Sequence, residues 1–222
     1  NESYANGGKA LPYPNVSGLG NGTDWQDEVF KDGVPIISND LTISGGGEKI
    51  AYSISGSHLD QEGIVGGDKS GFLRNTARLG LTADLSDKFK LKTNVIYTYF
   101  TRNTLNENGL GSVLFNALNV PATLTPYDAN GDFTLVPNTT GLGNEIINPL
   151  AQIANTYNDY NYKKLNGNFG LDYKIFKGFV LSSSIGFNTS NSESKTFGKQ
   201  ISYGGKVFDV QRSSVRQTTT ND

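Results

Sequence analysis

The feature that most constrains the fold is a pair of long alternating segments, residues 73–85 and 89–101, joined by the short turn Ser86-Asp87-Lys88. Odd positions are mainly apolar and even positions mainly polar, so a sheet built from them has one apolar and one polar face. Each strand would run about 13 residues, roughly twice the usual 5–6 of globular proteins. A strand that crosses a membrane needs about 9–11 residues plus overhang. The pattern therefore predicts a membrane-spanning β-barrel.

A similar hairpin is predicted within residues 38–58. Apolar residues alternate with serine and threonine on both sides of a run of three glycines. If Gly46-Gly47 forms a two-residue primed turn, Ile43 pairs with Ile50 and the apolar faces of the two strands match.

A third hairpin is predicted from about residue 161 to residue 191, with its turn near residues 176–178. In a membrane barrel the apolar face contacts lipid and the polar face lines the interior. The side chains expected to point outward are Leu79, Leu81, Val95, Tyr97, Phe169, Leu171, Leu181 and Ile185.

The connections alternate between short and long. The three hairpin turns are tight, whereas about 59–71, about 102–158 and the stretch after residue 192 are long. Tight periplasmic turns and long outer loops are typical of outer-membrane barrels. The predicted divisions are an outer loop region at 1–36, two hairpins at 37–101, a long outer loop at 102–158, a hairpin at 159–192, and an outer loop with a possible further strand at 193–222.

The predicted loop at 102–158 is unusually long for a compact domain. It contains apolar residues at near-helical spacing, which predicts a short helix or a local hairpin within it. These residues are Leu114, Phe115, Leu118 and Val120.

Aromatic residues concentrate near the strand ends. Two belts of Tyr and Phe are expected at the two interfaces of a membrane barrel, and the alternative is the general preference of aromatic residues for strands. One group lies near the tight turns (Phe89, Tyr173, Phe176 and Phe179) and the other near the long loops (Tyr97, Tyr99, Phe100, Tyr157, Tyr160 and Tyr162).

Composition narrows the possible functions. The formal net charge of −2 argues against a nucleic-acid partner. The absence of cysteine excludes disulfide frameworks, thiolate zinc sites and cysteine nucleophiles. The sequence contains no run of 18 apolar residues, which excludes a transmembrane helix. Because the chain opens on Asn1-Glu2 without a signal peptide, we expect a mature segment or a fragment of a longer protein.

Several blocks resemble the barrel of SusC/RagA-like TonB-dependent transporters, over about residues 20–190. The most specific is TDWQDEVF at 23–30, and it is followed by NDLTISGG at 39–46 and YSISGSHLDQEGI at 52–64. Weaker matches are PYDANG at 126–131 and NPLA at 148–151.

This resemblance implies an all-β fold, an antiparallel transmembrane β-barrel segment with about 6–8 strands of a barrel of about 22. It implies an importer of oligosaccharides or peptides in the Gram-negative outer membrane. The implied partners are outer-membrane lipid, a SusD-like surface lipoprotein and TonB, which acts through a plug domain absent from this chain. The resemblance implies neither an enzymatic role nor a cofactor.

Two other readings stay open. The first is a small, complete porin-like outer-membrane barrel, in which a seventh or eighth strand would close onto the first. The second is a soluble secreted carbohydrate-binding β-sandwich, in which the strands would be only about 5–7 residues long.

Few residues suggest chemistry. His58 is the only histidine, so a Ser-His-Asp or histidine-metal site could form only around this one ring, and a solvated residue at a strand end is expected. Asp60 and Glu62 offer two carboxylates for acid-base chemistry or cation binding, but a polar outer turn closed by Gly63 is favoured.

Asp128-Ala129-Asn130-Gly131-Asp132 has the alternating oxygen ligands of a calcium loop. However, residues 133–137 lack the glutamate that completes such a loop, and Asn-Gly is a strong hairpin signal. A hairpin within the long loop is favoured over calcium.

Four cations, Arg74, Arg78, Lys90 and Lys92, share the polar face of one hairpin. They could steer an anionic substrate, or pair with carboxylates of a plug or of neighbouring strands, which is favoured.

Trp25, with Tyr4 and Tyr13 upstream, could stack on a sugar ring or act as a packing anchor. The sequence therefore assigns no catalytic, metal-binding or cofactor residue, and it leaves the substrate-binding residues unknown.

Overall fold

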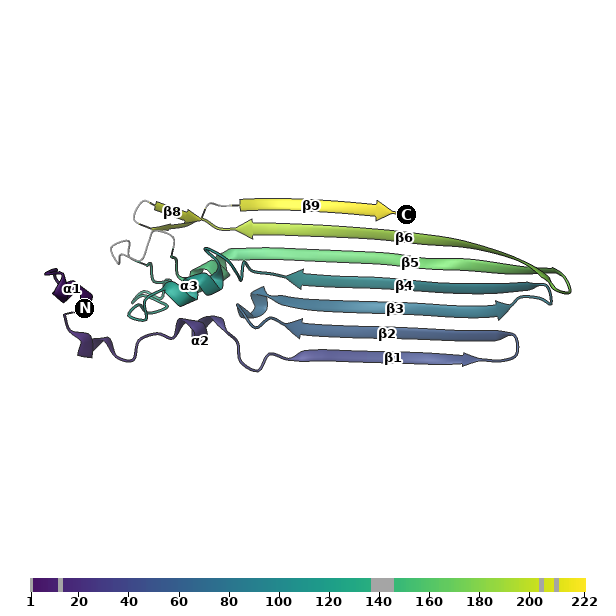
Figure 1. Cartoon of the computed structure of the whole chain (residues 1–222), viewed down its shortest axis with the longest axis horizontal. Helices are drawn as coiled ribbons and strands as arrows, with labels where there is room; N and C mark the ends of the chain where they lie inside the picture. The colour runs from purple at the N-terminus through teal and green to yellow at the C-terminus, as the bar shows by residue number, and fades with distance from the viewer. Residues whose placement is uncertain (1, 12–13, 137–145, 204–205, 210–211) are drawn as a thin grey trace.

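The computed structural model is dominated by one antiparallel sheet of seven strands, in the order β1-β2-β3-β4-β5-β6-β9. The structure describes residues 2–11, 14–136, 146–203, 206–209 and 212–222. Figure 1 shows the strands lying side by side along the long axis of the molecule. The strands are β1 (Ile36–Gly46), β2 (Ile50–Glu62), β3 (Gly71–Asp84), β4 (Phe89–Asn103), β5 (Thr156–Phe176), β6 (Phe179–Gly198) and β9 (Arg212–Asn221), with β7 (Ile201–Tyr203) and β8 (Lys206–Asp209) pairing separately.

The strand connections alternate between the two ends of this sheet, as the short-long pattern predicts. Tight turns join β1 to β2, β3 to β4 and β5 to β6 at one end, which we call the turn end. The longer connections lie at the opposite loop end, where Figure 1 also shows the helices. The helical segments are α1 (Glu2–Asn6), η1 (Val16–Leu19), α2 (Trp25–Val29), η2 (Gly67–Lys69), α3 (Val113–Asn119) and α4 (Pro149–Asn155).

The connection between β2 and β3 is shorter than predicted. The sequence reading placed a polar turn at Asp60–Glu62, but these residues continue β2 and pair with residues 71–73 of β3. The chain turns only from Gly63, whose N–H donates to the Ser70 carbonyl (2.9 Å). A charged strand end is stable here because it pairs on both sides, with β1 and β3.

The predicted register of the first hairpin is wrong. Ile43 lies opposite Ile54 rather than Ile50, and the turn residues are Glu48 and Lys49 rather than two glycines. Two of the three glycines allow close approach instead, because a Cβ on Gly45 would lie 2.7 Å from the Tyr52 hydroxyl oxygen and one on Gly46 would lie 2.6 Å from the Ile50 carbonyl oxygen. The register shift is an even number of residues, so the apolar faces still match.

The other two hairpins have the predicted faces. In the second, Leu79 lies opposite Val95 and the Leu85 N–H donates to the Phe89 carbonyl (2.8 Å). In the third, Phe169 lies opposite Ile185, but the strands run 21 and 20 residues, and the pairing extends over 156–198. The serine-rich end of β6 stays in the sheet because β9 pairs with it from Thr189 to Gly198.

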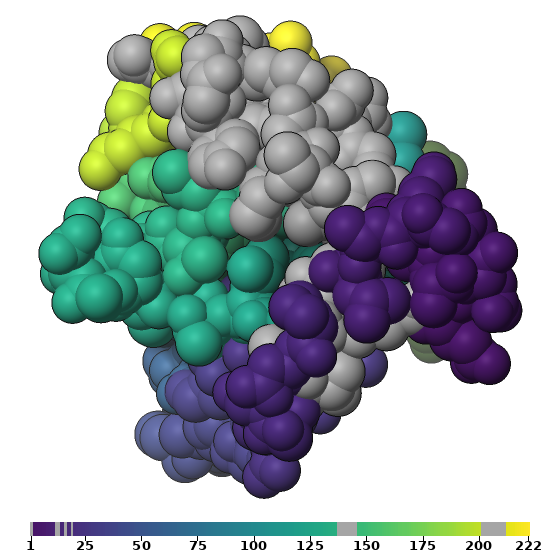
Figure 2. Space-filling view, turned by 90° about the vertical axis from the view of Figure 1, so that its left-hand side faces the viewer, coloured from purple at the N-terminus to yellow at the C-terminus, as the bar shows by residue number. Residues whose placement is uncertain are grey.

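The helices of the loop end enclose a small hydrophobic core. Trp25 is 4% exposed and packs in one cluster with residues of α2, α3 and the connections. Its indole N–H donates to the Pro121 carbonyl (3.1 Å), so Trp25 is a packing anchor and not a sugar-stacking platform. Figure 2 views this end and shows the N-terminal segment in purple beside the teal surface that includes α3. The buried members are Trp25, Val29, Val65, Val113, Ala117, Val120, Val136 and Ile146.

The segment between β4 and β5 is folded in its described part. Helix α3 confirms the short helix predicted from the near-helical spacing. The hydroxyl of its N-cap residue Ser112 accepts the Phe115 N–H (3.1 Å). The buried Asn116 amide donates to the Gln152 side-chain oxygen (2.8 Å), which ties α3 to α4. No helix among the described residues is both long and apolar enough to cross a membrane.

Candidate functional site

One face of the sheet, the apolar face, exposes a broad hydrophobic surface. It carries the odd-numbered residues of β3 and β4, and the strand register places all eight predicted outward side chains on it. Ile185 is 69% exposed and Leu181 56% exposed, and none of the eight is buried. This confirms the predicted outward face, because a soluble domain would enclose such residues in its interior.

The hydrophobic part of this face has a defined height. Along β4 it runs over five alternate residues from Phe89 to Tyr97, and neighbouring strands place Leu, Ile, Val, Phe and Tyr in the same rows. At about 3.4 Å per residue this is about 27 Å along the strand, or about 21 Å along the axis of a barrel with strands tilted about 40°. The apolar band of outer-membrane barrels is about 25 Å tall.

The apolar face becomes polar one row nearer the loop end. In that row the His58 Nδ1 lies 2.8 Å from the Asn75 Oδ1, and the Asn191 amide donates to the Thr219 hydroxyl (3.0 Å). His58 therefore lies within β2, and not at a strand end as predicted. The remaining members of the row are Asn39, Tyr99 and Lys163.

Beyond this row the apolar face carries charge. Glu193 accepts hydrogen bonds from Lys195 (2.6 Å) and Gln217 (2.8 Å), and Glu62 pairs with Lys31. These polar rows show that the sheet extends past the hydrophobic band at the loop end.

The aromatic belts form only in part. At the turn end, the Phe89 and Tyr173 rings stack with centroids 4.6 Å apart on the apolar face. At the loop end, Tyr97 and Tyr99 lie on the apolar face, but Phe100, Tyr160 and Tyr162 lie on the opposite face. The grouping by strand end missed this difference, because residues of even and odd number in one strand point to opposite faces.

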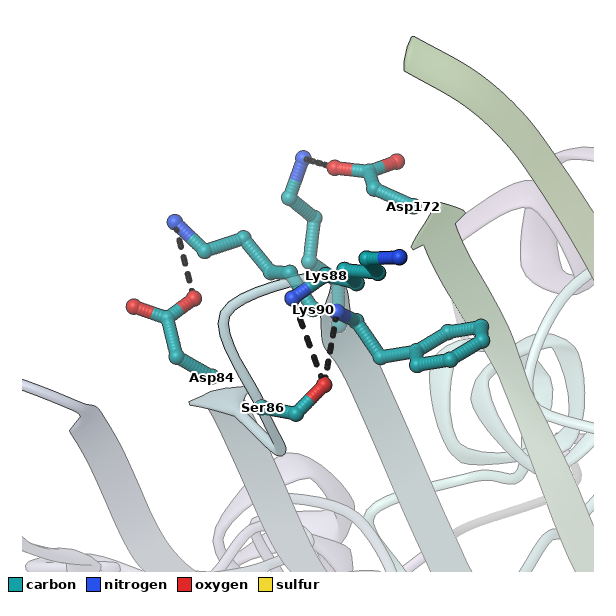
Figure 3. Close-up of polar contacts among 7 residues, drawn as sticks. Asp84, Ser86, Lys88, Lys90 and Asp172 are labelled. Carbon is teal, nitrogen blue, oxygen red and sulfur yellow. Dashed lines mark hydrogen bonds and ion pairs between the residues drawn. The ribbon is translucent and has the colours of Figure 1, made fainter. Parts of the chain in front are cut away.

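The opposite face, the polar face, carries ion pairs near the turn end. Figure 3 shows Lys90 reaching Asp84, and it also shows Asp172 with an ammonium partner. The distances are 3.3 Å for Lys90–Asp84 and 2.7 Å for Lys92–Asp172. The Arg78 Nε–H donates to the Asn94 side-chain oxygen (3.0 Å). Two of the four predicted cations thus pair with carboxylates of neighbouring strands, as the favoured reading expected.

Near the loop end, the polar face carries an aromatic cluster from three strands. Phe100 on β4 lies 5.4 Å from Phe72 on β3 and 4.9 Å from Tyr162 on β5, measured between ring centroids. Tyr160 and Tyr162 have nearly parallel rings, 6.5 Å apart at 13°. All four are half-buried. Sequence reasoning missed this cluster, whose signal is aromatic residues at positions where the alternation calls for polar ones.

The remaining candidates resolve as structural features. Residues 128–132 form a hairpin turn in which the Asp128 carboxylate accepts the N–H groups of Asn130 (2.8 Å) and Asp132 (3.0 Å), and Tyr127 pairs with Phe133. This is the favoured hairpin geometry. No group of three or more His, Asp or Glu among the described residues is placed to hold a metal ion. Tyr13 lies outside the described residues.

These observations define the class of protein. A sheet of long strands with an exposed apolar band on one face, polar groups on the other, and connections sorted by end is the wall of a membrane β-barrel. A sandwich of short strands does not fit, because the strands of the main sheet have 10–21 residues. A small closed barrel does not fit either, because β1 and β9 are the two edges of this sheet and do not pair within the described residues.

Comparison with known proteins agrees with this class. No protein-family profile matches the chain. The chain is 27% identical over 205 residues to TonB-dependent receptor P3 of Formosa agariphila (90% of this chain, 20% of that protein) and 30% identical over 197 residues to receptor P26 of the same organism (89% and 19%). It is 26% identical over 206 residues to TonB-dependent receptor SusC of Bacteroides thetaiotaomicron (84% and 20%).

Solved structures show the same fold. The RagAB peptide importer in its open-open state matches with a TM-score of 0.64 at 21% identity, covering 91% of this chain and 23% of that one. These similarities confirm the resemblance to the SusC/RagA-like TonB-dependent receptors, with this chain corresponding to a segment of their barrel. The chain spans about a fifth of the length of the curated relatives.

Proposed function

We propose that this chain forms part of the wall of a TonB-dependent importer in the Gram-negative outer membrane. The observation that carries the proposal is the exposed apolar band, whose height of about 21 Å fits a bilayer and whose opposite face carries charged and hydrogen-bonding groups. The apolar face contacts lipid and the polar face lines the lumen. The named relatives are TonB-dependent receptors and a peptide importer, which supports transport without an enzymatic step.

The orientation in the membrane is part of this proposal. We infer that the loop end faces the cell exterior and the turn end faces the periplasm, because outer-membrane barrels have long outer loops and short periplasmic turns. The loop end would then meet a SusD-like surface lipoprotein, and TonB would act from the other side through a plug domain. The ligand would be an oligosaccharide or a peptide that enters from the loop end.

Import is tested in cells that lack the full-length receptor containing this chain. Uptake of labelled oligosaccharides and peptides is compared between these cells, cells with the receptor restored, and restored cells without TonB. We expect uptake of at least one nutrient to need both the receptor and TonB. Uptake that is unchanged without TonB would contradict the proposal and favour a passive pore.

Orientation is tested with single cysteines, since the chain itself has none. Asn130→Cys at the loop end and Asp87→Cys at the turn end both replace exposed residues. A membrane-impermeant maleimide added to intact cells should label the first variant only. Labelling of the second variant alone would reverse the orientation.

A further inference from the structure

We propose that the polar face near the loop end is a binding subsite for an anionic oligosaccharide, formed by the aromatic cluster and the cations around it. The inference rests on the proposed import function and names the substrate class for that lumen. It starts from the positions of the side chains in two neighbouring rows of the sheet.

The two rows hold aromatic rings beside guanidinium groups. Phe72, Arg102 and Tyr160 occupy one row across β3, β4 and β5, while Arg74, Phe100 and Tyr162 occupy the next. The Arg102 guanidinium lies 5.4 Å from the centroid of the Tyr160 ring, within the range of a cation–π contact. The diagonal Phe72–Phe100 contact and the Phe100–Tyr162 contact within one row make one aromatic surface across three strands, and arginine lies on both sides of it.

The charge on this part of the polar face is positive. Arg74, Arg102 and Arg216 are exposed, and no ion pair to them occurs within the described part of the chain. Lys164 lies in the adjacent row. Among the strand residues of the main sheet at similar heights, the acidic ones lie on the apolar face instead, apart from Asp40 on the edge strand β1: Asp60, Glu62, Asp159 and Glu193.

This segregation of charge has a consequence for a ligand in the lumen. Cations on neighbouring strands with no strand carboxylate between them raise the local concentration of anions. Arginine also binds a carboxylate or sulfate through two parallel hydrogen bonds.

Hydroxyl groups continue the same rows. Ser192 on β6 lies opposite Tyr162, and Ser194 lies opposite Tyr160. Thr218 and Arg216 extend these rows onto β9. A serine or threonine hydroxyl both donates and accepts hydrogen bonds, as a sugar hydroxyl does.

The combination matches a charged sugar better than other anions. The C–H face of a pyranose meets the negative face of an aromatic ring, its hydroxyls meet the serines and Thr218, and its carboxylate or sulfate meets the arginines. A neutral sugar can use only the aromatic rings and the hydroxyl groups, whereas an acidic peptide uses mainly the arginines.

The test uses the full-length receptor in detergent, with binding measured by titration calorimetry. The probes are a hexamer of galacturonic acid, the neutral hexamer maltohexaose and the peptide hexaglutamate. We expect the galacturonate hexamer to bind at least about tenfold more tightly than either of the other probes, since charge-assisted hydrogen bonds are the strong ones. Its affinity should fall as salt is raised.

Matched variants locate the site. Phe100→Leu keeps an apolar side chain but removes the ring face, and it should weaken galacturonate binding severalfold, whereas Tyr99→Leu, one residue away on the opposite face, should leave it unchanged. Arg74→Gln should weaken the anionic hexamer about tenfold and leave maltohexaose binding unaffected. Lys164→Gln should weaken it less, and its neighbour on the apolar face, Lys163→Gln, should have no effect. Heat-modifiable gel mobility confirms that each variant is folded.

Three results would overturn the subsite: equal affinity for both sugars with no effect of Arg74→Gln, binding of hexaglutamate alone, or no binding of any probe by the folded receptor. The uptake experiment is independent of these results. TonB-dependent uptake of a nutrient without galacturonate binding would refute the subsite and keep the importer. Binding without any TonB-dependent uptake would keep the subsite and refute the importer.

Discussion

The turn-end half and the loop-end half of the sheet share the same period-two alternation of side chains, but their two faces differ in different properties. In the turn-end half, the two faces differ in polarity: leucine, isoleucine and phenylalanine oppose lysine, asparagine and serine. In the loop-end half both faces are largely polar, and they differ in charge and in aromatic content. The period of two fixes which residues share a face. The residue types on each face match the medium that the face contacts, lipid or water.

The largest expected effect comes from placing a charge on the apolar face of the turn-end half. Leu81 lies in the middle of the five hydrophobic rows, opposite Thr93 of β4. Leu81→Arg should therefore destabilise the folded receptor by about 2–4 kcal/mol, the cost of arginine at the bilayer midplane. The measurement is urea-dependent folding into lipid vesicles, read by heat-modifiable gel mobility.

Thr82→Arg is the matched control, because Thr82 lies one residue further on the polar face, opposite Lys92. Its arginine would point into an aqueous lumen and should change stability little. Equal destabilisation by the two substitutions would refute the assignment of one lipid face and one aqueous face.

An intermediate effect is expected at Gly167, which lies between Val95 and Phe187 on the apolar face. A Cβ there would lie 2.6 Å from the Asn94 carbonyl oxygen and 2.9 Å from the Phe187 ring. Gly167→Ala should cost about 1–3 kcal/mol in the same folding assay, as overpacking typically does. Gly56→Ala is the control, since the nearest atom to its Cβ would be 4.0 Å away. A similar loss from both would show that strand propensity, rather than contact with the ring and the backbone, controls the result.

The smallest effect is expected at Leu73, an apolar residue on the apolar face of the loop-end half. It lies opposite Asp60 and Thr101, two rows beyond Tyr97, where the hydrophobic rows end. Leu73→Arg should cost at most about 1 kcal/mol in the vesicle assay, because the penalty falls toward the interface. A cost as large as that of Leu81→Arg would place Leu73 inside the lipid and extend the band.

Much of the sheet could be predicted from the sequence because each long strand repeats its face assignment many times. The second hairpin illustrates this, since Leu79 and Val95 share a face in any register that keeps the alternation in phase. The fold class follows from the same repetition together with strand length. One residue that breaks the alternation cannot reverse the assignment of a face when several other residues of the strand specify it.

Register and function depend on fewer residues, and there the sequence reading failed. Three consecutive glycines look like a turn, but Gly45 instead makes room for the ring of Tyr52 across the strand. Grouping aromatic residues by strand end places Tyr99 and Phe100 in one belt, although their side chains point to opposite faces. Trp25 could not be placed at all, since its partner Pro121 lies 96 residues away.

The small core of the loop end joins segments that are far apart in the sequence because strands lie between them. Trp25, Val65 and Ala117 come from three different parts of the chain and are buried in one cluster. A change in the size of one of these side chains must be matched by its neighbours, because a close-packed core transmits a change of volume. On the lipid face, by contrast, one apolar residue can replace another with little consequence for its neighbours. Substitutions should therefore accumulate independently along the strands but in compensating sets within the loops.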